Sequence, residues 1–366
     1  MTAHQTTAAT VGALGPRTNH LGVPAPALPT PRGPLSDVII GALRRAPGGA
    51  LRAGDVEHCD LLVDDDAQLA LTCCYELAYS GFRDVDDGWE HDPALLRVRA
   101  ALEAAFVRSI RDEIGVPVRL GPAAVGETLR DLAGGGGRSL SGWMAEHGTV
   151  EHFREFCMHR SQYQLKEADP HTWAIPRLRG RAKAAFVHIQ YDEYGSGVPD
   201  AMHAELFATT MRALRLDDRP GAYLDVLPAA TLATGNLVTL FGLHRRWRGA
   251  AVGHLALFEM TSVGPMSRYS LALDRLGFGP EARRFYDVHV EADALHEQIA
   301  LDDMVAGLVD DEPDLGGDVV FGARALALVE SRFAGGLLDA WAAGDDALVV
   351  PGVGRPPRCA DAPHAA

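Results

Sequence analysis

Cysteine is scarce in this sequence, with five residues in 366. The number is odd, and no two cysteines have the C-x-x-C spacing of a zinc ribbon or a redox motif. The composition therefore argues against a disulfide framework, and it fits a reducing environment such as the cytoplasm.

Long apolar runs and large basic clusters are also missing. No run approaches the ~18 apolar residues of a membrane-spanning helix, and the first residues lack the basic and apolar regions of a secretory signal. Basic residues number 34 against 49 acidic ones, for a formal net charge of −15, which argues against nucleic acid and anionic membranes as partners. The short basic run at 245–248 (RRWR) is more typical of a solvated corner between helices. We expect a cytoplasmic protein.

What remains is a chain with helical periodicity nearly throughout, because alternating strand-like runs are rare. Residues 1–34 are rich in Ala, Thr, Pro and Gly and are expected to be disordered. A helical region follows at 35–133, where Asp92 and Pro93 are typical of the start of a long helix reaching about Ile114. Four glycines at 134–137 are read as a linker. A helical core is expected at 139–344, and residues 345–366 are expected to form a loose tail. The core helices are expected near 139–147, 150–168, 179–194, 200–215, 230–243, 246–262, 265–276, 280–308 and 319–342.

The most informative stretch is HVEADALH at 289–296. A helix turns about 100° per residue, so His289, Asp293 and His296 lie at roughly 0°, 40° and −20° on one face. Imidazole and carboxylate are ligands of non-haem iron and related metals. A polar helix face with two solvated histidines is the alternative.

Further carboxylates and histidines stand in apolar surroundings. Glu167 ends one apolar helix, Glu193 ends another, and His203 begins the next. Glu259 lies in an almost wholly apolar run, where a lone carboxylate is costly unless it finds a cation. The alternative to a metal ion is an ion pair between Glu259 and an arginine such as Arg268 or Arg275. His188 and Asp192, four residues apart, are read as surface residues.

Helix bundles build dinuclear carboxylate sites from inward-facing Glu and His on several helices. The Glu-x-x-His motif of ferritin-like sites is absent at the positions that would need it, so a ferritin-like site is a poor match.

These residues occur in motifs that resemble the haem-oxygenase-like di-iron oxidases, also described as iron-containing redox enzymes. The motifs, in order, are YQLKEADP at 163–170, DEYGSG at 192–197 followed by His203, LFEM at 257–260, and the stretch at 289–296. Together they cover about 150–310. The segments at 236–247 and 75–89 also look like this family.

The resemblance implies an all-α, haem-oxygenase-like helical bundle with an N-terminal helical extension that helps to form a homodimer. It implies two iron ions, O₂ as cosubstrate, a small-molecule substrate and an external electron donor. The implied iron ligands are Glu167, Glu193, His203, Glu259, His289, Asp293 and His296.

Within the family, three histidines and a long interval between the Glu and His ligands are typical of N-oxygenases, which act on an amine or guanidine. This sequence, with Glu193 and His203 ten positions apart, resembles that branch more closely. An oxidative C–C lyase or decarboxylase acting on an amino or fatty acid is the alternative, and a metal-free helical protein that binds a small molecule is the alternative of another class. Predicted pocket residues are Tyr163, Phe186, Phe207, Met211, Leu240 and Phe258.

Overall fold

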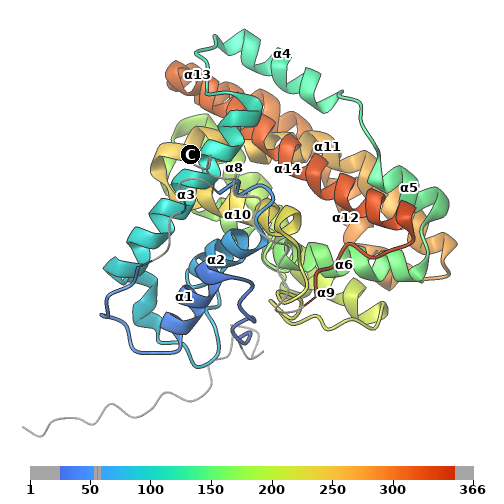
Figure 1. Ribbon diagram of the computed structural model, residues 1–366. Helices are drawn as coiled ribbons and strands as arrows, with labels where there is room; N and C mark the ends of the chain where they lie inside the picture. The colour runs from blue at the N-terminus through green and yellow to red at the C-terminus, as the bar shows by residue number, and fades with distance from the viewer. Residues whose placement is uncertain (1–24, 53–55, 57–58, 351–366) are drawn as a thin grey trace, which may run out of the picture.

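The computed structural model describes residues 25–52, 56 and 59–350, and it is built from helices (Figure 1). No strand occurs among these residues, which confirms the all-α prediction. The N-terminal region forms α1 (Pro34–Leu43), α2 (Asp65–Glu76), α3 (Pro93–Ile114) and α4 (Pro122–Ala133). The Asp92 side chain accepts hydrogen bonds from the backbone N–H groups of Ala94 and Leu95, so α3 starts with the predicted cap.

The remaining helices form the bundle that follows the residues 134–139. They are α5 (Leu140–His147), α6 (Val150–Gln164), α7 (Asp169–Thr172), α8 (Gly180–Glu193), α9 (His203–Ala213), α10 (Ala229–Leu243), α11 (Arg248–Arg275), α12 (Pro280–Gln298), α13 (Ala306–Asp311) and α14 (Gly316–Ala343). Short 3₁₀ turns lie at Asp87–His91, Ile175–Arg177, Gly195–Gly197, Pro199–Ala201, Arg245–Trp247 and Pro313–Leu315. None of the helices in the described ranges is long and apolar enough to cross a membrane.

The expected helices differ in continuity at two places, and the one expected at 150–168 ends earlier, at Gln164. The helices expected at 246–262 and 265–276 are one continuous helix, α11, with Pro265 inside it. Proline removes one hydrogen bond of the ladder, but α11 packs along α12, α14 and α5, and this packing keeps the helix in one piece. The helix expected at 280–308 is interrupted by a π-helical segment, Ile299–Val305, between α12 and α13.

The two long helices α11 and α14 pack closely at the centre of the bundle (Figure 1). Glycine makes this approach possible, because a Cβ on Gly253 would lie 1.8 Å from the backbone oxygen of Val319. Reciprocally, a Cβ on Gly322 of α14 would lie 2.0 Å from the backbone oxygen of Ala250. Side chains would push the two backbones apart.

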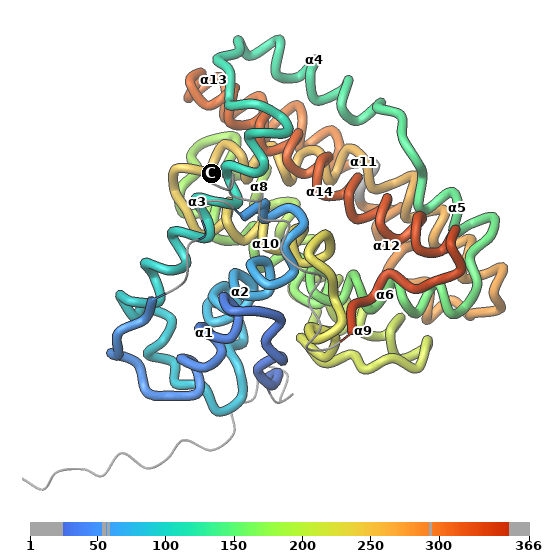
Figure 2. The backbone as a smooth tube through the Cα atoms, in the orientation of Figure 1, coloured from blue at the N-terminus to red at the C-terminus, as the bar shows by residue number. Residues whose placement is uncertain are grey.

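The N-terminal region shares its hydrophobic core with the bundle. Ile39, Leu71 and Phe106 belong to the same buried cluster as Leu240 and Val252. Helix α2 packs on α10, and α4 packs on α14 (Figure 2). The region is therefore an integral part of the folded unit, and its predicted role in a dimer stays a prediction.

The predicted disordered segment and loose tail are each partly packed. The buried guanidinium of Arg32 donates hydrogen bonds to the backbone oxygens of Leu227 and Leu224, at 2.6 and 2.7 Å. Near the other end, Ala347 N–H donates to Glu155 and Val349 N–H donates to the backbone oxygen of Val226. The prediction of disorder therefore does not hold for 25–34, nor that of a loose tail for 345–350. Residues 1–24 and 351–366 lie outside the described residues.

Candidate metal centre

Six of the seven predicted ligands converge in the interior of the bundle. Each comes from a different place along the chain: the turn between α6 and α7, the last residue of α8, the first residue of α9, the middle of α11, and two positions on α12. All six are buried: Glu167, Glu193, His203, Glu259, His289 and His296. The side chain of the seventh, Asp293, lies outside the described residues.

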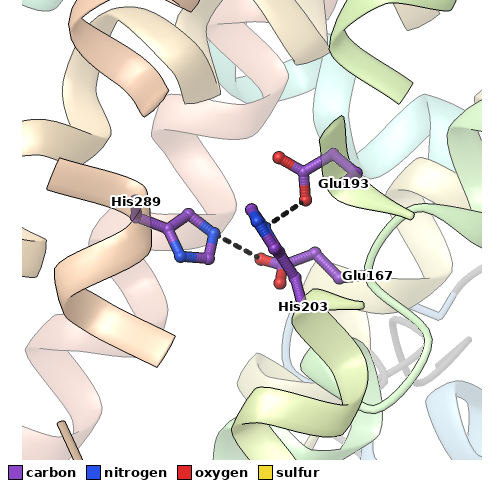
Figure 3. A group of neighbouring side chains, drawn as sticks. All are labelled: Glu167, Glu193, His203 and His289. Carbon is purple, nitrogen blue, oxygen red and sulfur yellow. Dashed lines mark ion pairs between the residues drawn. The ribbon is translucent and has the colours of Figure 1, made fainter. Parts of the chain in front are cut away.

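Four of these side chains form a first group, which Figure 3 shows. One ligand atom from each of Glu167, Glu193, His203 and His289 lies within 4.8 Å of those of the other three. His203 Nδ1 lies 2.8 Å from Glu193 Oε2, and His289 Nε2 lies 3.8 Å from Glu167 Oε1. The two imidazole rings are 4.3 Å apart between centroids.

A second group consists of Glu193, Glu259 and His296, whose ligand atoms also lie within 4.8 Å of one another. His296 Nδ1 is 3.3 Å from Glu259 Oε2. Glu193 belongs to both groups, so one carboxylate stands between two sets of donor atoms.

The local chain geometry explains how Glu193 and His203 meet. Gly195 has φ +64°, in the left-handed region, and a Cβ there would lie 2.4 Å from the backbone carbon of Ala201. Glycine is the residue that tolerates both constraints. The chain therefore reverses directly after α8, and α9 starts with His203 facing Glu193.

Hydrogen bonds outside the cluster fix which nitrogen of two histidines can act as a ligand. His289 Nδ1 lies 2.7 Å from the backbone oxygen of Phe285, so Nδ1 carries the hydrogen and Nε2 keeps its lone pair toward Glu167. His296 Nε2 lies 3.0 Å from Asp192 Oδ2, so Nε2 donates and Nδ1 keeps its lone pair toward Glu259. Metal-bound histidines commonly have such a partner on the second nitrogen.

Electrostatics favour an ionised carboxylate at the shared position. Burial alone would raise the pKa of Glu193, but the surrounding imidazoles of His203, His289 and His296 lower this pKa well below its ordinary value. A carboxylate must be ionised to bind a metal.

The donor set fits iron. Ligand bonds of about 2.0–2.2 Å place neighbouring donor atoms roughly 3 Å apart and opposite ones roughly 4.3 Å apart, and the observed contacts of 2.8–3.8 Å lie in this range. Nitrogen and oxygen donors without sulfur suit non-haem iron.

The structure does not pair Glu259 with either of the arginines that the sequence offers as partners. Arg268 Nε donates to Ser141 Oγ, and Arg275 donates to backbone oxygens of Met144, Ala145 and Gly148. Both arginines thus serve to attach the segment that contains α5, and Glu259 contacts His296 instead.

Asp192 is the residue that the sequence reasoning misjudged. The spacing to His188 predicts a surface residue, but Asp192 is the partner of His296 and its side chain is 30% exposed. His188 contacts it weakly, at 3.8 Å. Successive helical residues point about 100° apart, so Asp192 can reach His296 while Glu193 faces the cluster. The position of Asp192 in the sequence does not by itself indicate that it is the hydrogen-bond partner of a histidine.

The six predicted pocket residues separate into two sets. Tyr163 and Phe258 line a small cavity beside Glu167, Glu193, Glu259 and His289, together with Leu255 and Met266. The other four are buried in the packed hydrophobic clusters: Phe186, Phe207, Met211 and Leu240. The sequence reasoning missed His171 and Gln190, which also line this cavity.

The fold and this cluster define an all-α protein whose bundle encloses a set of metal-ligand side chains. Residues 154–331, just under half of the chain, match the family of iron-containing redox enzymes. The matched stretch contains all six converging residues.

A curated relative is a nitrosourea synthase from Streptomyces achromogenes subsp. streptozoticus, which is 24% identical over 222 residues. The alignment covers 60% of this chain and 47% of the relative, so the chain spans about half the length of that protein.

Proposed function

We propose that this iron-containing redox enzyme is a non-haem di-iron oxygenase that oxidises a nitrogen of a small metabolite. The observation that carries the proposal is the pair of buried donor groups that share Glu193. A shared carboxylate between two such groups is the arrangement by which helix bundles hold two metal ions.

In this proposal Glu167, His203 and His289 would hold one ion, Glu259 and His296 would hold the other, and Glu193 would be shared between the two. Two bound iron ions would supply the redox chemistry that activates O₂. Oxygenation of an amine places one oxygen atom on nitrogen and releases the other as water, and it takes two electrons and two protons from an external donor.

The chain itself contributes in two ways: it holds the imidazoles in position, and it excludes water from the cluster. The apolar side chains of Tyr163, Leu255, Phe258 and Met266 cover one side of the cluster, which keeps bulk water from the ions. Phe285 and Asp192 hold two imidazoles in the orientation that binding requires.

Two observations favour nitrogen over carbon as the oxidised atom. Three histidines stand in the cluster, in the sequence pattern that is closer to N-oxygenases, and the curated relative is named for a product with an N-nitroso group. Oxidative C–C cleavage by the same centre is the outcome that product analysis must separate.

The test starts with anaerobic addition of Fe(II) to the full chain, which should bind about two irons. Glu193→Ala should lose both ions, whereas His203→Ala and His296→Ala should each lose one. Glu281→Ala is the matched control, since this exposed carboxylate lies in the first turn of α12, the helix that carries His289 and His296. A folded chain that takes up no iron, or a Glu193→Ala variant with unchanged iron content, would refute the proposal.

The reaction type is tested by exposing the loaded protein to O₂ with candidate amines and guanidines and a chemical reductant. Hydroxylamine, nitroso or nitro products are expected by mass spectrometry. Shortened carbon skeletons with released CO₂ would show the lyase instead. A homodimer and a cytoplasmic location stay predictions, and light scattering of the purified chain checks the first.

A further inference from the structure

A pocket lies between the end of α2 and the candidate metal centre. Glu167 and Glu193 form its inner wall, and Glu76 and Tyr79 of the N-terminal region form part of its outer wall. Its volume is about 70 Å³. Since one water needs roughly 10–15 Å³, it holds on the order of five waters, or a chain with a similar number of heavy atoms.

The charged side chains of this pocket are strongly unbalanced. They are five carboxylates and one ammonium: Glu76, Glu167, Asp169, Glu193, Glu205 and Lys166. Apolar and aromatic groups, such as Leu165, Met202 and Tyr194, fill the space between them.

The single basic side chain is already engaged by the N-terminal region. Lys166 Nζ lies 2.6 Å from Glu76 Oε2, with the two side chains 16% and 9% exposed. The same ammonium lies 4.1 Å from the centre of the Tyr79 ring. An anionic ligand could use Lys166 only by displacing Glu76 from a largely buried ion pair, which would leave that carboxylate without its partner.

Asp169 adds a further carboxylate to the pocket wall. Its Oδ1 accepts a hydrogen bond of 2.8 Å from the hydroxyl of Tyr194, and a neutral donor does not cancel a charge. Bound iron would neutralise Glu167 and Glu193, and Lys166 balances Glu76. Asp169 thus remains as a source of negative potential beside the route to the centre, and Glu205 lies on the same pocket wall.

We propose that this pocket takes a small organic cation, an ammonium or guanidinium group on a short carbon chain. The charged group binds at Asp169 as an anchor, and the chain extends toward Glu167 and Glu193, so the anchor is not the atom that is oxidised. The inference rests on the proposed function, because it takes the six converging residues as the reacting centre. It makes Glu76 a specificity-determining residue, since this side chain of the N-terminal region withdraws Lys166 from anionic ligands.

The test measures binding of three probes with the same n-butyl chain, n-butylammonium, n-butylguanidinium and pentanoate, by calorimetry on the full chain. Each titration is done on the metal-free protein and again after anaerobic loading with Fe(II). The two cations should bind, and pentanoate should bind at least about tenfold more weakly, as expected for the loss of a charge-assisted hydrogen bond. Binding to the metal-free chain does not depend on iron chemistry, so a failure of the proposed function leaves this result interpretable.

Variants separate charge from structure. Asp169→Asn should weaken cation binding by about tenfold or more, whereas Tyr194→Phe removes the hydroxyl donor, keeps the carboxylate and should retain binding. Asp37→Asn removes one exposed carboxylate far along the chain and should change nothing. Glu76→Gln frees Lys166 and should strengthen pentanoate binding. Equal affinity for pentanoate and the cations in the unmodified protein, or unchanged cation binding in Asp169→Asn, would overturn the proposal.

Discussion

The hydrogen bond between Asp192 and His296 offers a sharp test of the candidate centre. The imidazole is almost fully buried, and its Nε2 lies 3.0 Å from Asp192 Oδ2. Without this acceptor, the hydrogen can move to Nδ1, the nitrogen that faces Glu259, and the lone pair that would bind iron is then lost. Removing such a partner typically costs ten- to a hundredfold in metal affinity, or about 1.4–2.8 kcal/mol.

We therefore expect Asp192→Ala to weaken the proposed iron site that contains His296, its hydrogen-bond partner, and to spare the site built from Glu167, His203 and His289. Anaerobic titration with Fe(II), followed by iron analysis after gel filtration, should show one tightly held ion in place of two. His188→Ala is the control, because its ring is half exposed and lies 3.8 Å from the same carboxylate. If Asp192→Ala holds both ions as tightly as the unmodified chain, the assignment of His296 Nδ1 as a ligand is wrong.

Three further predictions concern stability. Arg32→Ala leaves two backbone oxygens without their buried donor and should lower the free energy of unfolding by about 3 kcal/mol in urea denaturation; a loss well below 1 kcal/mol would contradict the packing of this segment. Gly253→Ala should destabilise by roughly 1–3 kcal/mol or more, because its Cβ would overlap the backbone oxygen of Val319, whereas Gly335→Ala, with open space around it, should be neutral or slightly stabilising. Burial lowers the pKa of His171 from 6.5 to about 4, so below pH 6.5 the unfolded chain binds the extra proton. This imidazole alone should therefore contribute a loss of about 3 kcal/mol of stability as the pH drops from 6.5 to 4, and a His171→Gln variant should show a flatter profile.

Local sequence signals located most of the helices and much of the candidate centre. Asp92 and Pro93 start α3 because a cap and a fixed φ act within one turn, independently of the rest of the chain. His289 and His296 lie on one face of α12 for an equally local reason. Their convergence with Glu259 could be inferred because a carboxylate in an apolar run must find a partner.

What the sequence could not reveal depends on contacts between distant segments. Asp192 has no distinguishing neighbour pattern, and its role arises because the last turn of α8 meets the last turn of α12 at His296. His171 lies 3.1 Å from His254, 83 positions away, in a fully buried pair. The segment at 25–34 is composed like a disordered chain, yet the carbonyl oxygens at 224 and 227 give Arg32 a buried binding site.

The same dependence on distant contacts explains why the cluster can exist before a metal binds. Three carboxylates and three imidazoles in a buried interior would be strongly unfavourable if they faced one another at random. Here imidazole contacts accompany the carboxylates, and acceptors outside the cluster, Phe285 and Asp192, hold two rings in one orientation. The same imidazoles and carboxylates would be the groups that hold a metal ion. Because the candidate ligands come from several helices that pack on one another, a rigid bundle also keeps the cluster rigid. The end of α2 in the N-terminal region forms part of the pocket beside this cluster.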